Sequence, residues 1–225
     1  MMSETVRLGI MSTEFRLTEL EATLDAVVEH GIPAVQLHIG SALPDVPLET
    51  ALYRGLDAIG DRVDAELCSR IRREFDARGL ELAAVDGTFN MINPDERARQ
   101  AGLGHLCRLI ELGEVLGTRV VTLCTGSRDD IMWYHHPDNA TPEAWADLVA
   151  VTKEAARIAE ANDGILAFEP EVGNPVSSAQ RARQLIDDVG SPAVKVLIDP
   201  ANMFQRGELP RMTEVLEEAF ELLGS

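Results

Sequence analysis

The stretch Ile165-Leu166-Ala167-Phe168-Glu169-Pro170-Glu171 places two carboxylates directly after a short apolar run. Such a run, here preceded by Gly164, is typical of a buried strand in a parallel sheet. Because an unpaired buried charge costs free energy, we expect the glutamates where the strand opens into a pocket. The pattern recurs at residues 194–199, which end in Asp199. Two strands that each end in an acid predict one shared site, and its expected ligand is a divalent cation.

Apolar runs and helical patterns alternate six times along the chain. The expected strands are residues 7–12, 33–39, 80–85, 119–124, 165–168 and 194–199. The expected helices begin at a capping box of Thr18 with Glu21 and then cover residues 64–78, 94–116, 141–161, 178–189 and 210–223. Residues 40–61 are expected to form a loop with a short helix. This alternation predicts a parallel sheet with right-handed crossovers.

The distribution of polar residues favours a barrel over an open, doubly wound sheet. No Gly-x-Gly-x-x-Gly follows the first expected strand, which leaves a dinucleotide fold unsupported. Polar residues follow every strand, as they do where a (β/α) barrel builds its site from all the loops at one end. Because the sequence contains no Gly/Ser linker, residues 1–225 are predicted to form one domain.

Composition excludes several classes of function. The net charge of −18 disfavours binding to nucleic acid or to an anionic membrane surface. No run is apolar enough to span a bilayer, and the first residues lack the layout of a signal peptide, so the cytoplasm is the expected location. Three cysteines, Cys68, Cys107 and Cys124, fit no zinc or redox spacing and are expected to be structural thiols.

The alternation of side chains along a strand predicts which residues meet. Glu169, Asp199 and His38 would converge at the mouth of the barrel. Two carboxylates with an imidazole suit Mn²⁺, Co²⁺ or Mg²⁺. Such a cation could polarise hydroxyl and carbonyl oxygens while a nearby carboxylate, with Glu171 as candidate, moves a proton. Lys195, on the face of Asp199, is expected to pair with an acid.

Simpler structural roles compete with these assignments. Glu169 and Asp199 could cap helices or form salt bridges, and Glu171 could be a solvated loop acid. His38 could ligate a metal, contact substrate or be buried in the core. Arg128 could bind an anionic group of a substrate, or it could lie on the surface.

Five motifs resemble the xylose-isomerase-like (β/α) barrel superfamily, in particular its sugar phosphate isomerase/epimerase branch. They are Gly87-Thr88-Phe89-Asn90-Met91, residues 122–128 (TLCTGSR), Trp133 with residues 136–139 (HPDN), residues 167–171 (AFEPE) and residues 197–202 (LIDPAN). The resemblance implies aldose–ketose isomerisation or epimerisation next to a carbonyl, through an enediolate or a metal-assisted hydride shift.

The resemblance also implies roles for single residues. Glu169 and Asp199 would hold the divalent metal, for which Zn²⁺ joins Mn²⁺, Co²⁺ and Mg²⁺ as a candidate, and Glu169 and Glu171 would be catalytic. A sugar or sugar phosphate would be the small-molecule partner. Asn202 stands where the family often has a substrate-binding histidine. The candidate substrate-binding residues are His38, Asn90, Arg128, His136 and Asn202.

The pattern departs from the family in one respect. Family members continue with a seventh strand that carries a histidine ligand and an eighth that carries a glutamate, but this pattern ends with residues 210–223. We therefore expect an incomplete barrel with six of eight strand–helix units, truncated at its C-terminal end, whose open strand edges favour a homo-oligomer. Such a chain should bind metal weakly and turn over sugar poorly.

Three other functions compete with this prediction. One is a truncated, inactive barrel, and another is an enolising dehydratase or lyase that uses the same metal and base chemistry. A DNA-repair endonuclease of the same superfamily is disfavoured by the charge of −18 and by Asp86, Thr125 and Asn202 near positions where that class needs histidine.

Overall fold

The computed structural model describes residues 8–15, 17, 19–204 and 207–223. Their strands are β1 (Gly9–Met11), β2 (Ala34–His38), β3 (Glu81–Asp86), β4 (Val120–Leu123), β5 (Ile165–Phe168) and β6 (Val194–Val196). Each strand pairs in parallel with the next in chain order, so the sheet order is β1-β2-β3-β4-β5-β6. The predicted capping box at Thr18 lies outside the described residues.

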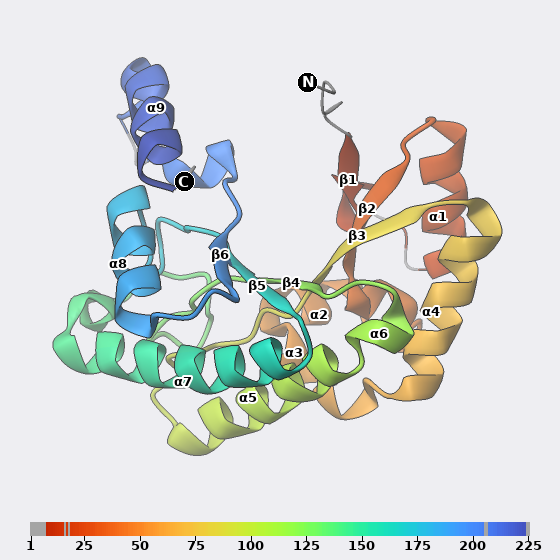
Figure 1. Cartoon of the computed structure of the whole chain (residues 1–225), viewed down its shortest axis with the longest axis horizontal. Helices are drawn as coiled ribbons and strands as arrows, with labels where there is room; N and C mark the ends of the chain where they lie inside the picture. Colours follow the sequence, from red (N-terminus) through yellow and green to blue (C-terminus); the bar gives the residue numbers. More distant parts are fainter. Residues whose placement is uncertain (1–7, 16, 18, 205–206, 224–225) are drawn as a thin grey trace.

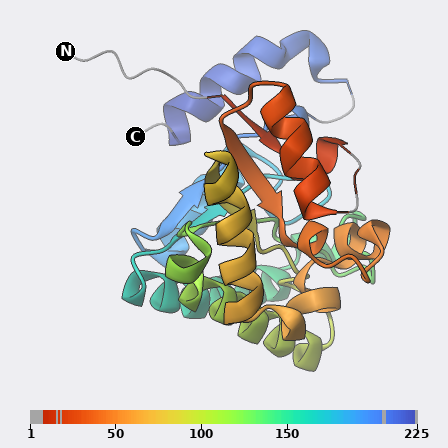
Figure 2. The same ribbon diagram turned by 90° about the vertical axis from the view of Figure 1, so that its right-hand side faces the viewer.

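Helices cover the outer face of this curved sheet (Figures 1 and 2). They are α1 (Leu20–Glu29), α2 (Leu48–Arg54), α3 (Leu56–Ile59), α4 (Ala65–Arg78), α5 (Glu96–Glu111), α6 (Gly113–Leu116), α7 (Pro142–Ala161), α8 (Ala179–Val189) and α9 (Met212–Leu223). A doubly wound sheet would reverse its strand order and carry helices on both faces, so the predicted barrel class is confirmed. Among the described residues, β1 and β6 do not pair with each other, and the barrel is open between them.

The parallel register sorts side chains into two sets. Leu37, Val85, Val121, Leu166 and Val194 lie opposite one another on successive strands and are buried in the main apolar core with residues of the helices. The neighbouring set on the strands is His38, Asp86, Thr122, Ala167 and Lys195. Because side chains alternate, this second set belongs to the inner, concave face, where the polar residues collect.

The expected helix 94–116 and the expected strand 194–199 have other bounds in the structure. The expected helix 94–116 begins later, because the Asp95 side chain accepts a 2.9 Å hydrogen bond from the Arg97 backbone and caps α5. It is interrupted at Leu112, beyond which α6 is a separate turn. The sixth strand ends at Val196, and Asp199 instead caps the 3₁₀ helix η5 (Pro200–Met203). In the part of the chain that the structure describes, no helix combines the length and apolarity needed to cross a bilayer.

Candidate active site

Glu169 and Asp199 lie side by side where β5 and β6 end. The backbone N–H of Glu169 donates a 2.8 Å hydrogen bond to the Leu123 carbonyl, and the N–H of Leu197 donates one of 2.9 Å to the Phe168 carbonyl. These bonds extend the pairing of β4, β5 and β6 up to the two acids. The carboxyl groups of Glu169 and Asp199 are close enough to share a hydrogen bond. A proton shared between the two carboxyl groups contributes to the raised pKa of Glu169.

Burial, together with the adjacent negative charge of Asp199, raises the pKa of Glu169 to about 7. A hydrogen bond of 2.7 Å from Asn202 Nδ2 to Glu169 Oε1 acts in the opposite direction and favours the ionised form. Burial also raises the pKa of Glu171, while hydrogen bonds from the backbone of Gly173 and Val172 oppose the shift. Glu169 therefore exchanges its proton near neutral pH, as a general acid–base does.

A pocket of about 390 Å³ opens beside the two acids and spans the gap in the barrel. Glu169, Leu197 and Asp199 line it from the side of β5 and β6. Met11, Gln36 and Glu14 line it from the side of β1 and β2, with Glu14 in the 3₁₀ helix η1 (Ser12–Phe15). The pocket thus lies at the carboxyl ends of the strands, where (β/α) barrels place their sites.

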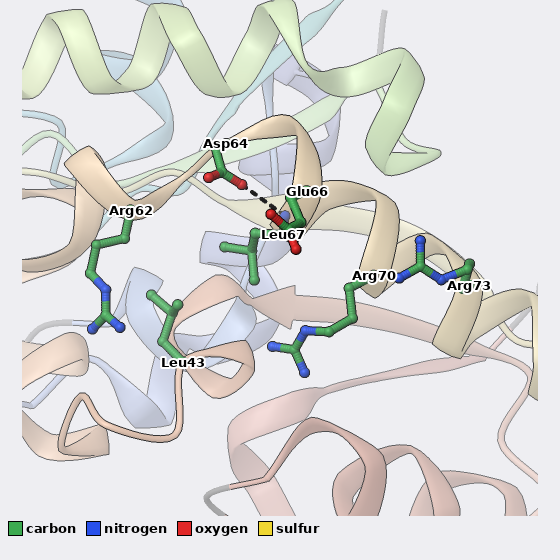
Figure 3. A pocket seen from close by; sticks show the side chains of 7 residues that line it. All are labelled: Leu43, Arg62, Asp64, Glu66, Leu67, Arg70 and Arg73. Carbon is green, nitrogen blue, oxygen red and sulfur yellow. Dashed lines mark hydrogen bonds between the residues drawn. The ribbon is translucent and has the colours of Figure 1, made fainter.

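Another hollow, of about 440 Å³, is lined by none of the residues of the first pocket (Figure 3). It lies where α4 begins and is lined by Arg62, Arg70 and Arg73 together with two leucines. Arg62 pairs with Asp45 at 2.5 Å and Arg70 with Glu21 at 3.2 Å. These pairs neutralise most of its positive charge, so the hollow offers no concentrated site for an anion.

A sequence model of the family described as xylose isomerase-like TIM barrel matches residues 24–223. The chain belongs to this family. Its members in the solved structures share the fold at low identity, whereas a search of curated proteins finds no match.

Three solved members of the fold illustrate the likeness. A 3-keto-D-glucoside 4-epimerase from E. coli superimposes with a TM-score of 0.69 at 13% identity, over 98% of this chain and 77% of that one. D-psicose 3-epimerase, solved in the presence of D-fructose, superimposes with a TM-score of 0.70 at 16% identity, over 97% of this chain and 71% of that one. A xylose isomerase-like TIM barrel protein from Mycobacterium smegmatis in complex with magnesium superimposes with a TM-score of 0.65 at 15% identity, over 94% of this chain and 72% of that one.

His38 lies on the concave face, two residues beyond Gln36 at the end of β2. Its ring is 3% exposed, with Nε2 3.6 Å from Oδ2 of Asp86, and Nδ1 has no hydrogen-bond partner among the described residues. The register places His38 opposite Asp86 and at the level of Ala167, two residues before Glu169 along the chain. Asp86 is close enough for its charge to raise the pKa of Glu169 further. Neither His38 nor Asp86 lines the 390 Å³ pocket.

Arg128 and Asn90 are engaged in holding loops. Arg128 donates to the carbonyl of Ile92 at 2.9 Å and to Asp147 at 2.6 Å, and its side chain is 12% exposed. The Asn90 amide accepts from the Ser127 backbone at 2.9 Å and donates to the Asp129 carbonyl at 3.2 Å. A substrate role for either residue remains a prediction, and each would have to exchange a protein partner for substrate.

The remaining predicted residues take separate places. His136 lies half-exposed in the loop after β4, where its Nδ1 accepts a 3.2 Å hydrogen bond from the Asp138 backbone. The side-chain amide of Asn202 donates a hydrogen bond to Glu169 and therefore lies beside the two carboxyl groups. The expected pairing of Lys195 with an acid is wrong for the described residues: the side chain is exposed and forms no ion pair with any of them.

Glu169 and Asp199 provide the kind of ligand that a divalent cation prefers, but they provide too few ligands to hold it on their own. Carboxylate oxygens are the donors that Mg²⁺ and Mn²⁺ prefer. Among the described residues, however, no group of three or more His, Cys, Asp and Glu side chains is arranged to hold a metal ion. Glu169 and Asp199 would therefore supply two of a metal's ligands, and water or further groups would have to supply the others.

The sequence patterns predicted no role in this site for Glu14, Gln36 or Asp86. Gln36 lies two residues before His38 on the same strand face, and its amide donates to Thr122 Oγ1 at 3.2 Å across the concave face. Asp86 ends β3 as Glu169 follows β5, so the acid-after-strand signal could have found it. Glu14 follows β1 within a short polar turn and carries no such signal.

Proposed function

We propose that the chain is an isomerase or epimerase of a sugar or sugar phosphate that moves a proton next to a carbonyl. The two acids Glu169 and Asp199, which line one pocket at the strand ends, are the observation that carries this proposal, and burial with the charge of Asp199 raises the pKa of Glu169 to about 7. Family membership and the folds of two sugar epimerases support it.

In this proposal Glu169 performs the proton transfer. Ionised, it takes the proton from the carbon beside the carbonyl, and protonated, it returns a proton to the enediolate. Asn202 donates to Oε1 of Glu169 and so fixes the orientation of its carboxyl group. Glu171 is the second candidate acid–base on the same loop, since burial raises its pKa as well.

The substrate would lie in the 390 Å³ pocket, within the size range of small-molecule sites. Gln36 offers an amide to hydroxyl groups, and Met11 and Leu197 offer apolar walls. When bound, a divalent metal on Glu169 and Asp199 would polarise the carbonyl and hydroxyl oxygens. Because two carboxylates alone bind such a cation weakly, we expect slow turnover by this chain.

Proton exchange in D₂O tests the proposal. The chain is incubated with D-fructose and a panel of other ketoses and aldoses with Mg²⁺ or Mn²⁺, and NMR follows deuterium incorporation beside the carbonyl. We expect exchange with at least one sugar and a loss of about 100-fold or more in Glu169→Gln, the range for removal of a general acid–base.

Glu29→Gln is the matched control, because Glu29 is exposed at the end of α1 and does not line the pocket. It makes the same change in charge and should leave the exchange rate unchanged. Equal exchange rates in Glu169→Gln and in the unaltered chain would overturn the assignment of Glu169.

A further inference from the structure

The pocket beside Glu169 is acidic on both of its walls. Glu169 and Asp199 form one wall, and Glu14 stands on the other, on the β1 side of the gap. Glu14 is exposed, and its carboxylate has no hydrogen-bond or ion-pair partner among the described residues. It is also not grouped with the pair closely enough to share a cation with it. Among the described residues, a cation held by the pair would therefore leave the charge of Glu14 without a neutralising partner.

No basic side chain of the described residues lines this pocket. Arg128, the residue expected to bind an anion, donates one guanidinium nitrogen to Asp147 and another to a backbone carbonyl. Asp147 also pairs with Arg99 at 3.3 Å, and none of these three charged side chains lines the pocket. Lys195 pairs with Ala167, which lies two residues before Glu169, and Lys195 does not line the pocket.

We propose that Glu14 is a specificity determinant that excludes phosphorylated sugars, so that the substrates of this site are uncharged polyhydroxy carbonyl compounds. The inference rests on the proposed function and decides between its two substrate classes. A phosphate monoester carries nearly two negative charges at neutral pH. Within a small pocket it would face Glu14 without a basic partner among the described residues, and like charges brought together disfavour the complex. Hydroxyl groups, in contrast, can donate hydrogen bonds to Glu14 and to the amide oxygen of Gln36.

The test compares binding of D-fructose with binding of D-fructose 6-phosphate, followed by ligand-observed NMR with and without Mg²⁺. We expect the phosphate ester to bind the unaltered chain at least about 10-fold more weakly than the free sugar at low ionic strength. Glu14→Gln should narrow this ratio several-fold, and high salt should remove most of the difference between the two chains. Glu29→Gln, which makes the same charge change outside the pocket, should leave the ratio as it is.

The proposal is overturned if the ester binds as tightly as the free sugar, if neither ligand binds, or if Glu14→Gln and Glu29→Gln give the same ratio. Because the readout is binding, it is separate from the proposed reaction. A chain that discriminates between the two sugars as expected but exchanges no proton would refute the reaction and support the selection by charge.

Discussion

Asn202 Nδ2 donates a 2.7 Å hydrogen bond to Oε1 of Glu169 and thereby joins η5 to the end of β5. The same short helix begins at Asp199, whose Oδ1 accepts from the Ala201 backbone at 2.8 Å. The sequence Asp199-Pro200-Ala201-Asn202 thus presents a carboxyl group and an amide to one glutamate from a single rigid turn. This turn adds two opposing effects to the burial that raises the pKa of Glu169: the charge of Asp199 raises the pKa further, and the hydrogen bond from Asn202 lowers it.

Replacing Asn202 with alanine should raise the pKa of Glu169 above about 7, because the lost hydrogen bond favours the ionised carboxylate. A hydrogen bond to a charged group contributes about 1.5–3 kcal/mol, and solvent access should reduce the effect here to about 1 kcal/mol. NMR titration of ¹³C-labelled glutamate carboxyls measures the change. A Glu169 pKa that stays the same or falls in Asn202→Ala would contradict this account.

Glu169→Gln should make stability less dependent on pH. Between the ordinary glutamate pKa of 4.5 and about 7, the folded chain keeps a proton on Glu169 that the unfolded chain releases. Stability therefore falls as pH rises through this window, and the loss is complete above about pH 7. The unaltered chain should lose about 2 kcal/mol of its free energy of unfolding between pH 5 and pH 8, a figure reduced for partial exposure. Glu169→Gln should not show this loss, so its stability relative to the unaltered chain rises by the same amount.

Urea unfolding at the two pH values measures this gain, with Glu29→Gln as the control in which a glutamate is lost outside the pair. The account fails if both variants change with pH in the same way. Because the titrating pair faces a pocket rather than the core, the substitution should fold normally.

A divalent cation should stabilise the chain only slightly, and through Glu169 and Asp199. Two carboxylates give weak binding, so a rise in Tm of a few degrees is expected at millimolar Mn²⁺. Asp199→Asn should abolish the rise, whereas Glu14→Gln should keep it, because Glu14 is not grouped with the pair. Thermal melts with Mn²⁺ and with EDTA decide, and an equal rise in Asp199→Asn would place the cation elsewhere.

Gly55 should tolerate no side chain. It has a φ of +51°, and a Cβ would lie 1.9 Å from the carbonyl oxygen of Thr88, which already accepts a 2.8 Å hydrogen bond from Leu56. We expect Gly55→Ala to lower the free energy of unfolding by about 3–5 kcal/mol, from backbone strain and overpacking together. Gly79→Ala is the matched control, since its φ is +65° with nothing within 4 Å of the added Cβ, and it should cost about 1–2 kcal/mol. Equal costs would mean that the Thr88 loop moves away freely.

Several features of the site could be predicted because they are local. The alternation along residues 165–169 and 194–199 indicated which acids end which strands, and the parallel alternation of elements brought those ends to one edge. The roles of Arg128 and Asn90 could not be predicted in this way. Their partners, Asp147 and the backbone of Ser127 and Asp129, are fixed by how loops fold back over the sheet, which no local pattern encodes.

The sequence by itself determined the parallel (β/α) architecture and the two carboxylates at neighbouring strand ends. Both depend on local features, namely the hydrophobic periodicity and the residues at which strands end. Only the tertiary structure decided that Glu14 faces this pair across the open barrel, that Asn202 binds Glu169 and that Lys195 stands apart. Those relationships depend on the curvature of the sheet and on loop conformation, which arise when segments far apart in the chain pack together.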